Sequence, residues 1–192
     1  MKAKREQWRV EQSAIDPEKV VFLDEMGATT NMTRRYGRSL KGQRLVCPVP
    51  HGHWKTTTFI AGLRSSGLTA PMVIDGAMNG DLFEAYVKQI LVPTLTPGDV
   101  VVLDNLPSHK RVPAIRAIEA AGGTVRFLPP YSPDLNPIEL AFSKLKSLLR
   151  KAEKRTVEGL WSFLGQALDL FTPKECLSYM RHDGYGQTLR GT

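Results

Sequence analysis

Three acidic residues stand where carboxylates from separate segments could act together. Asp24 ends the apolar run VVFLD, Asp104 ends the similar run GDVVVLD, and Glu139 follows the proline-rich stretch LPPYSPDLNP. Converging carboxylates repel one another unless a cation lies between them, and hard oxygen ligands suit Mg²⁺ or Mn²⁺. Two such ions about 3.5–4 Å apart form the site with which nucleases and polymerases cleave phosphodiesters. The three acids are therefore candidate metal ligands for phosphodiester chemistry.

Each acid also has a purely structural interpretation. An aspartate at the end of a strand often satisfies backbone groups in the next turn, which applies to Asp24, Asp75 and Asp104 alike. Glu139 lies three residues after Asn136, so the two could form a capping box at a helix start. The stiff approach through four prolines instead favours a carboxylate held in one place.

Four further features of the sequence are weaker candidates. Asp134 is the alternative third acid, although it lies in the loop before the helix. Glu25 follows the first aspartate on a strand and should point the other way, as a supporting or structural residue. His109 could contact phosphate or water, but a polar helix start is the simpler interpretation. The HGH stretch at 51–53 lacks partners with zinc spacing, which favours a loop.

The order of elements predicts an α/β fold, a mixed sheet flanked by helices. Short apolar runs predict strands at 20–24, 54–63, 68–75, 98–104 and 124–128. Helical periodicity predicts helices at 79–95, 108–123, 137–152, 156–170 and 173–182. Residues 25–53, rich in Gly, Arg, Thr and Pro, predict loops with room for a hairpin. If the strands that end in Asp24 and Asp104 are neighbours, their carboxylates meet at one edge of the sheet.

The 192 residues bound the protein to one domain with a sizeable core. We divide it into a charged lead-in (1–19), a catalytic domain (20–155) and a helical extension of that domain (156–192). No run of eighteen apolar residues is present, so no membrane span is expected. Cys47 and Cys176 lie far apart without metal or disulfide spacing, which fits a reducing cytoplasm.

The charge of the chain favours a polyanionic partner, with nucleic acid first. Lys and Arg number 26 against 19 acids, a net charge of +7. Basic runs lie at 33–38 and 144–155, and Glu139 stands in line with Lys146 and Arg150 on its helix. Either run could be a solvated face, but beside three acids we expect contacts with a nucleic-acid backbone. The expected contact residues are Arg34, Arg35, Lys144, Lys146 and Arg150.

Three ordered motifs resemble those of a known family. VVFLDE, VVLDNLPSHK and LPPYSPDLNPIELAFSKLK resemble the catalytic motifs of DDE transposases, and most closely the bacterial insertion-sequence branch of the mariner-like superfamily. The 34 residues between Asp104 and Glu139 are typical of that branch. The blocks TNMTRRYGRSLKGQR, GHWKTTTFIAGL and ECLSYMRHDGY are also similar to it. The resemblance therefore covers about residues 8–186.

This resemblance implies a ribonuclease H-like fold and a cut-and-paste reaction. It implies that Asp24, Asp104 and Glu139 are the catalytic triad and bind Mg²⁺, for which Mn²⁺ substitutes. The reaction would be hydrolysis at the ends of an element, followed by attack of the freed 3′-hydroxyl on target DNA, typically at TA. The implied partner is DNA, the implied active form a homodimer, and the implied location the cytoplasm at the nucleoid.

The sequence departs from the family pattern in two places. Phe142 stands where the family usually has tryptophan, three residues after the glutamate. Full-length relatives carry helix-turn-helix modules, for which the stretch before Val20 is too short, so we expect the catalytic half, with a separately encoded helix-turn-helix half as a candidate partner. Two other functions stay open: a catalytically incompetent DNA-binding remnant, and a ribonuclease H-type enzyme that cleaves RNA.

Overall fold

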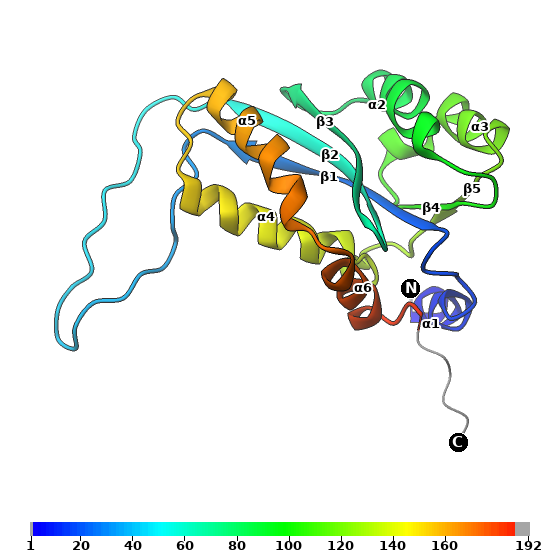
Figure 1. Ribbon diagram of the computed structural model, residues 1–192, viewed down its shortest axis with the longest axis horizontal. Helices are drawn as coiled ribbons and strands as arrows, with labels where there is room; N and C mark the ends of the chain where they lie inside the picture. The colour runs from blue at the N-terminus through cyan, green and yellow to red at the C-terminus, as the bar shows by residue number, and fades with distance from the viewer. Residues whose placement is uncertain (1, 187–192) are drawn as a thin grey trace.

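The strand that carries the first motif, VVFLDE, lies at the centre of the sheet (Figure 1). A computed structural model describes residues 2–186 of the chain. Its strands are β1 (Val20–Thr29), β2 (Thr56–Arg64), β3 (Gly67–Asp75), β4 (Val100–Leu103) and β5 (Thr124–Phe127). They lie in the order β3-β2-β1-β4-β5, with antiparallel pairing from β3 to β1 and parallel pairing from β1 to β5. The predicted mixed sheet is confirmed.

Helices cover both faces of this sheet. They are α1 (Lys2–Gln12), α2 (Gly80–Tyr86), α3 (Val112–Ala120), α4 (Ile138–Ala152), α5 (Val157–Ala167) and α6 (Pro173–His182). In Figure 1, α2 and α3 lie over one face, α4 and α5 over the other, and α1 lies near α6 at one end. Among the described residues, none of these helices has both the length and the apolar character needed to cross a membrane.

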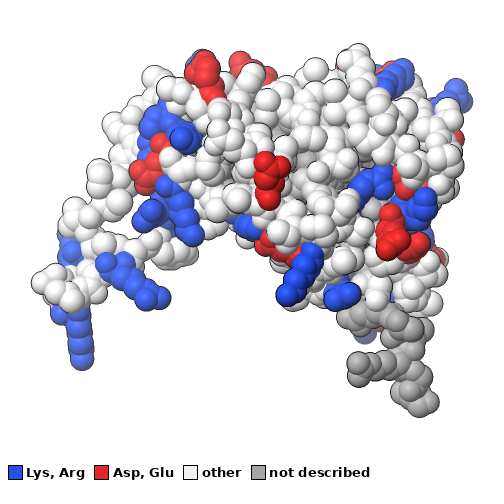
Figure 2. Space-filling model, in the orientation of Figure 1, with Lys and Arg blue, Asp and Glu red and all other residues white. Residues whose placement is uncertain are grey.

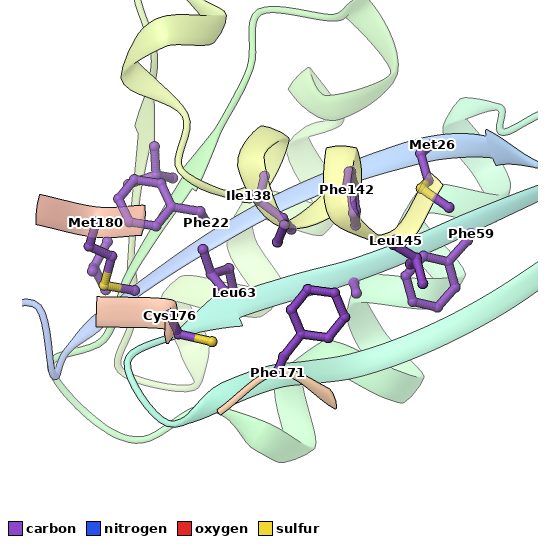
Figure 3. Close-up of a cluster of buried hydrophobic side chains, with 14 of the residues drawn as sticks. Phe22, Met26, Phe59, Leu63, Ile138, Phe142, Leu145, Phe171, Cys176 and Met180 are labelled. Atoms are coloured by element: carbon purple, nitrogen blue, oxygen red, sulfur yellow. The ribbon is translucent and has the colours of Figure 1, made fainter. Parts of the chain in front are cut away.

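Alternating residues of β1 build two separate cores. Phe22 and Met26 are buried with Phe142 of α4, whereas Val21 and Leu23 belong to the core under α2 and α3. Figure 3 shows the first of these cores, with the apolar stripe of α4 lying along β1 and β2. Because side chains of a strand alternate between its faces, one strand can anchor both layers. The burial of β1 on both faces fixes its position at the centre.

Several element predictions differ from the structure in their bounds or type. β1 runs five residues past its predicted end at 24, and residues 30–55 contain no hairpin but form a loop that extends from the body (Figure 1). The predicted helix at 79–95 is an α-helix only to Tyr86, followed by a π-helical turn and a 3₁₀ turn. The predicted helix at 108–123 is broken between a 3₁₀ turn and α3.

A buried hydrogen-bond chain ties α1 and the C-terminal region to the loop before α4. The indole N–H of Trp8 donates to the Tyr185 hydroxyl (3.0 Å), which donates to the carbonyl of Leu135 (2.7 Å). The guanidinium of Arg5 binds both carboxylate oxygens of Asp134, at 2.6 and 2.9 Å. Two distant segments, α1 and the region around Tyr185, thus hold the loop that leads into the third motif. The last part of the predicted extension, residues 187–192, lies outside the described residues.

This chain of hydrogen bonds predicts a cost for removing one hydroxyl. Tyr185→Phe keeps the edge-to-face contact with Phe22 (4.6 Å between ring centroids) but leaves a buried N–H and a buried carbonyl unpaired. We expect the free energy of unfolding to fall by about 1–3 kcal/mol, measured by urea denaturation. The control is Tyr36→Phe, because Tyr36 is 91% exposed. Equal stability of the two variants would contradict the role of Tyr185.

Candidate active site

The three predicted acids line one pocket at the end of the sheet. Asp24, Asp104 and Glu139 border a cavity of about 510 Å³, whose far wall is formed by residues 128–133. The parallel register of β1 and β4 pairs Phe22 with Val102, and each aspartate lies two residues further along its strand. Both carboxylates therefore leave the sheet at the same level, as predicted, and the start of α4 brings Glu139 to them.

Asp24 is the most buried of the three acids, with 7% of its surface exposed. Its Oδ1 accepts a hydrogen bond from the backbone N–H of Glu25 (2.7 Å), and its Oδ2 accepts one from Nδ2 of Asn136 (2.8 Å). Burial, together with the negative charges of Glu139 and Asp104, raises the pKa of Asp24 to about 7. A nearby cation would remove this penalty on the ionised carboxylate.

Asn136 does not cap the helix, so the structural alternative of a capping box is wrong. α4 begins at Ile138 after Pro137, and no side chain caps its first turn. The amide of Asn136 turns instead to Asp24, and its own Oδ1 is buried without a hydrogen-bond partner within the described residues. Glu139 is exposed and lines the pocket, and its carboxylate forms no hydrogen bond or ion pair within residues 2–186. This carboxylate is thus available to a ligand.

His109 supports the second aspartate, a role that the sequence interpretation missed. Its Nδ1 lies 2.6 Å from Oδ1 of Asp104 and its Nε2 lies 2.8 Å from Oε2 of Glu25. The ring is fully buried and packs against Phe83, with centroids 4.5 Å apart. Burial opposes protonation, but the two carboxylates raise the pKa of His109 to about 9. The spacing of five residues after Asp104 was the available signal.

Hydrogen bonds also fix the charge state of Asp104. Although burial acts in the opposite direction, His109 and the backbone N–H of Leu106 (2.9 Å to Oδ1) hold the pKa of Asp104 below its usual range. These donors occupy Oδ1, while Oδ2 accepts no hydrogen bond within residues 2–186. Asp104 therefore presents one ionised oxygen without a protein donor.

Two of the remaining predicted residues, Asp134 and Lys144, are engaged in ion pairs away from the three acids. Asp134, the alternative third acid, is paired with Arg5 and Arg9 and does not line the pocket of the other acids. Lys144 binds Glu175 (2.6 Å) and lies over the ring of Phe171, so its charge is already compensated.

Three of the predicted basic residues lie together elsewhere. Arg35, Lys146 and Arg150 line a second pocket, while Arg34 is an exposed residue of the long loop. His51 and His53 are exposed in that loop as well, which agrees with the loop interpretation.

The donor set at the three acids fits a hard divalent cation that keeps part of its water. Within residues 2–186, no three His, Cys, Asp or Glu side chains form a closed metal-binding group. The oxygens that lack protein donors are Oδ2 of Asp104, the carboxylate of Glu139 and Oδ1 of Asn136. Mg²⁺ is commonly bound by one or two carboxylates with several waters rather than by a full protein cage. All-oxygen ligands of this kind suit Mg²⁺ or Mn²⁺.

A mixed sheet with this order, flanked by helices, has the ribonuclease H-like fold of the solved structures described below, which confirms the predicted fold class. The sequence model of the DDE superfamily endonucleases matches residues 19–161, and the chain belongs to this family. A comparison with curated proteins found no match.

Several solved structures share this fold. The Mos1 strand transfer complex is 20% identical with a TM-score of 0.73, over 95% of this chain and 56% of that chain. The Mos1 mariner paired-end complex with Mn is 18% identical with a TM-score of 0.71 and the same coverage. The catalytic domain of Mos1 mariner transposase is 16% identical with a TM-score of 0.64, over 97% of this chain and 93% of that domain. This chain thus spans little more than half of the chain in the complexes, but nearly the whole catalytic domain.

The raised pKa of Asp24 predicts a pH-dependent effect of Asp24→Asn on stability. The folded chain keeps a proton on Asp24 between pH 3.8 and about 7, whereas the unfolded chain has lost it, so stability falls as pH rises through this window. Without divalent cations at pH 8, the variant should be more stable than the parent, by at most about 4 kcal/mol at about 1.36 kcal/mol per pKa unit. The difference should vanish near pH 4.

Thermal unfolding at several pH values measures this effect. The matched control is Asp75→Asn, an exposed aspartate at the end of β3, which should show a much smaller change. A difference between Asp24→Asn and the parent that is the same at pH 4 and pH 8 would refute the electrostatic cost at Asp24.

Proposed function

We propose that this chain is the catalytic domain of a DDE transposase, which cleaves DNA and transfers its strands with Mg²⁺, or Mn²⁺ in its place. We assign the metal and the catalysis to Asp24, Asp104 and Glu139. The observation that carries the proposal is that these acids, from three distant motifs, line one pocket in which Asp24 is buried among like charges. Membership of the DDE superfamily endonucleases supports it.

The residues around the pocket would orient the ligands and the DNA. A divalent cation bound here lowers the pKa of an attacking water or 3′-hydroxyl and stabilises the leaving oxygen. Asn136 holds Asp24 in place, and His109 holds Asp104 against Glu25. Tyr131, 89% exposed on the pocket wall, offers an aromatic face on which an unpaired base can stack.

We further assign the chain to the bacterial insertion-sequence branch of the mariner-like superfamily. The proposed reaction is hydrolysis at the ends of the element, then attack of the 3′-hydroxyl on target DNA. Solved Mos1 structures include paired-end complexes with Mg and with Mn and a strand transfer complex, which supports the choice of substrate and metal. We propose a homodimer as the active form, a helix-turn-helix module as the partner that recognises the ends, and a location at the nucleoid in the cytoplasm.

The two competing functions are less well supported. A catalytically incompetent remnant has no reason to keep three acids on one pocket with a bridging histidine behind them. A ribonuclease H-type enzyme would use the same metal site, so the substrate distinguishes it. Cleavage of an RNA–DNA hybrid in preference to duplex DNA would favour that alternative.

Metal binding can be tested without DNA. In a calorimetric titration with Mn²⁺, we expect Asp24→Asn, Asp104→Asn and Glu139→Gln each to weaken binding at least about tenfold. Losing even a residue that only supports a metal ligand costs about that much affinity. The control is Asp75→Asn, an exposed aspartate at the end of β3 that does not line the pocket and should bind Mn²⁺ as the parent does. Unchanged binding in Glu139→Gln would remove this residue from the proposed ligand set.

Catalysis can be separated from DNA binding by one substitution. Asp104→Asn should abolish Mn²⁺-dependent nicking of duplex DNA but leave salt-sensitive DNA binding nearly intact, because it changes a metal ligand and keeps the basic surface. Nicking is measured on gels and binding by fluorescence anisotropy. Nicking that persists in the purified variant would refute the assignment of the triad.

A further inference from the structure

A second pocket lies further along the same two elements that carry Asp24 and Glu139. It has a volume of about 430 Å³ and lies between the end of β1, the start of the long loop and α4. We call it the basic pocket and define it by Gly27, Thr29, Asn31, Arg35, Lys146 and Arg150. Figure 2 shows Lys and Arg side chains gathered where the long loop leaves the body, beside a hollow between the loop and the body.

The basic pocket contains positive charge that the described part of the chain does not compensate. Arg35, Lys146 and Arg150 line it together with no acidic residue, and none of the three forms an ion pair or a hydrogen bond within residues 2–186. Nearby, Glu153 is already engaged by Arg155 (3.3 Å) and by the hydroxyl of Thr33 (3.3 Å). Three like charges around one hollow repel one another, so an anion bound there is favourable.

Neutral donors add to this charge. The hydroxyl of Thr29 donates to Oδ1 of Asn31 (2.6 Å), which leaves the amide N–H groups of Asn31 available to a ligand. β1 pairs with β4 only as far as Phe22, so the edge of β1 that leads to the basic pocket has no strand beside it. Guanidinium, ammonium and amide donors around an open hollow are the groups that bind phosphate oxygens.

Strand β1 and helix α4 both place the basic pocket at about the same distance from the candidate active site. Along β1, Gly27 and Thr29 lie three and five residues after Asp24, or about 10–17 Å at about 3.3 Å per residue. Along α4, Lys146 and Arg150 lie seven and eleven residues after Glu139, or again about 10–17 Å at about 1.5 Å per residue. This separation matches about three to five phosphates of one B-DNA strand, at about 3.4 Å each along the axis.

The helical repeat also puts these α4 residues on one line. At about 100° per residue, Lys146 and Arg150 lie within about 20° of the direction of Glu139. Lys144 lies about 140° away from it, which agrees with its contacts to Glu175 and Phe171 on α6 and before it. One edge of α4 therefore runs from the catalytic pocket to the basic pocket.

We propose that the basic pocket binds the backbone of the substrate DNA three to five nucleotides from the scissile phosphate. This inference rests on the proposed function and narrows it: of the five basic residues expected to contact DNA, it assigns Arg35, Lys146 and Arg150. The pocket fixes the register of the duplex over the candidate active site. A phosphate backbone fits better than an acidic segment of a second copy, because the spacing along both elements matches consecutive phosphates.

The first test measures the salt dependence of duplex binding without divalent cations, so that no cleavage occurs. The double substitution Lys146→Gln/Arg150→Gln should make the negative slope of log K against log salt shallower by about 1.8, since each phosphate contact contributes about −0.9. Lys151→Gln/Lys174→Gln removes the same charge from exposed positions outside the pocket and should change the slope far less. Equal slopes in the two double variants would overturn the proposal.

The second test locates the contact. Single neutral methylphosphonate linkages are placed one to eight steps on either side of the mapped nick. Linkages three to five steps away on one side should weaken binding by the parent and have no further effect on Lys146→Gln/Arg150→Gln. Coupling at other steps, or none, contradicts the assigned register.

Further measurements separate this proposal from the catalytic one. If nicking depends on Asp104 but the salt slope of Lys146→Gln/Arg150→Gln equals that of the parent, only the proposal for the basic pocket is overturned. If the salt slope of this variant is shallower but nicking does not depend on Asp104, the proposed catalysis is overturned, while the pocket keeps its role in DNA binding. Loss of dimerisation in sedimentation, with DNA binding unchanged, would assign the pocket to a second copy of this chain and overturn the proposal.

Discussion

The parallel pairing of β1 with β4 is the constraint on which the site depends. It aligns Phe22 with Val102, so that Asp24 within β1 and Asp104 just after β4 lie at the same level of the sheet. β4 ends at Leu103, whereas β1 continues to Thr29. Beyond Phe22, the edge of β1 on the side of β4 therefore has no paired strand within the described residues. Helix α4 packs on one face of β1, and Asn136 from the loop before it reaches Asp24. Both the pocket of the three acids and the basic pocket are lined by residues of β1 and α4.

Bringing carboxylates together in a partly buried place costs free energy, and the surrounding structure offsets part of it. Asn136 and a backbone N–H donate to Asp24, and His109 lies between Asp104 and Glu25 as a buried positive charge. The loop that carries Asn136 is itself held by α1 and by Tyr185, far away in the sequence. The N-terminal helix, expected only as a charged lead-in, thus packs into the structure that supports the site.

Local patterns predicted most elements and the convergence of the acids, because parallel neighbouring strands end at a common edge. They failed where a long-range contact competes with a local one. Asn136 has the spacing of a helix cap, but the carboxylate of Asp24, 112 residues away in sequence, takes its amide. His109 resembled a polar helix start until the fold brought Glu25 to its other nitrogen. The loop at 30–55 lacks the hairpin because no alternating pattern in it could pair strands.

Helix α4 joins the two proposed sites, and its faces have separate partners. One face packs Phe142 and Leu145 into the core and fixes the helix on β1. An adjacent edge carries Glu139 at its start and Lys146 and Arg150 further along. Since an α-helix has a fixed rise and twist per residue, the spacing between Glu139 and the two basic residues along the helix is fixed. The same burial that stabilises the core therefore fixes where on the DNA the proposed cleavage occurs.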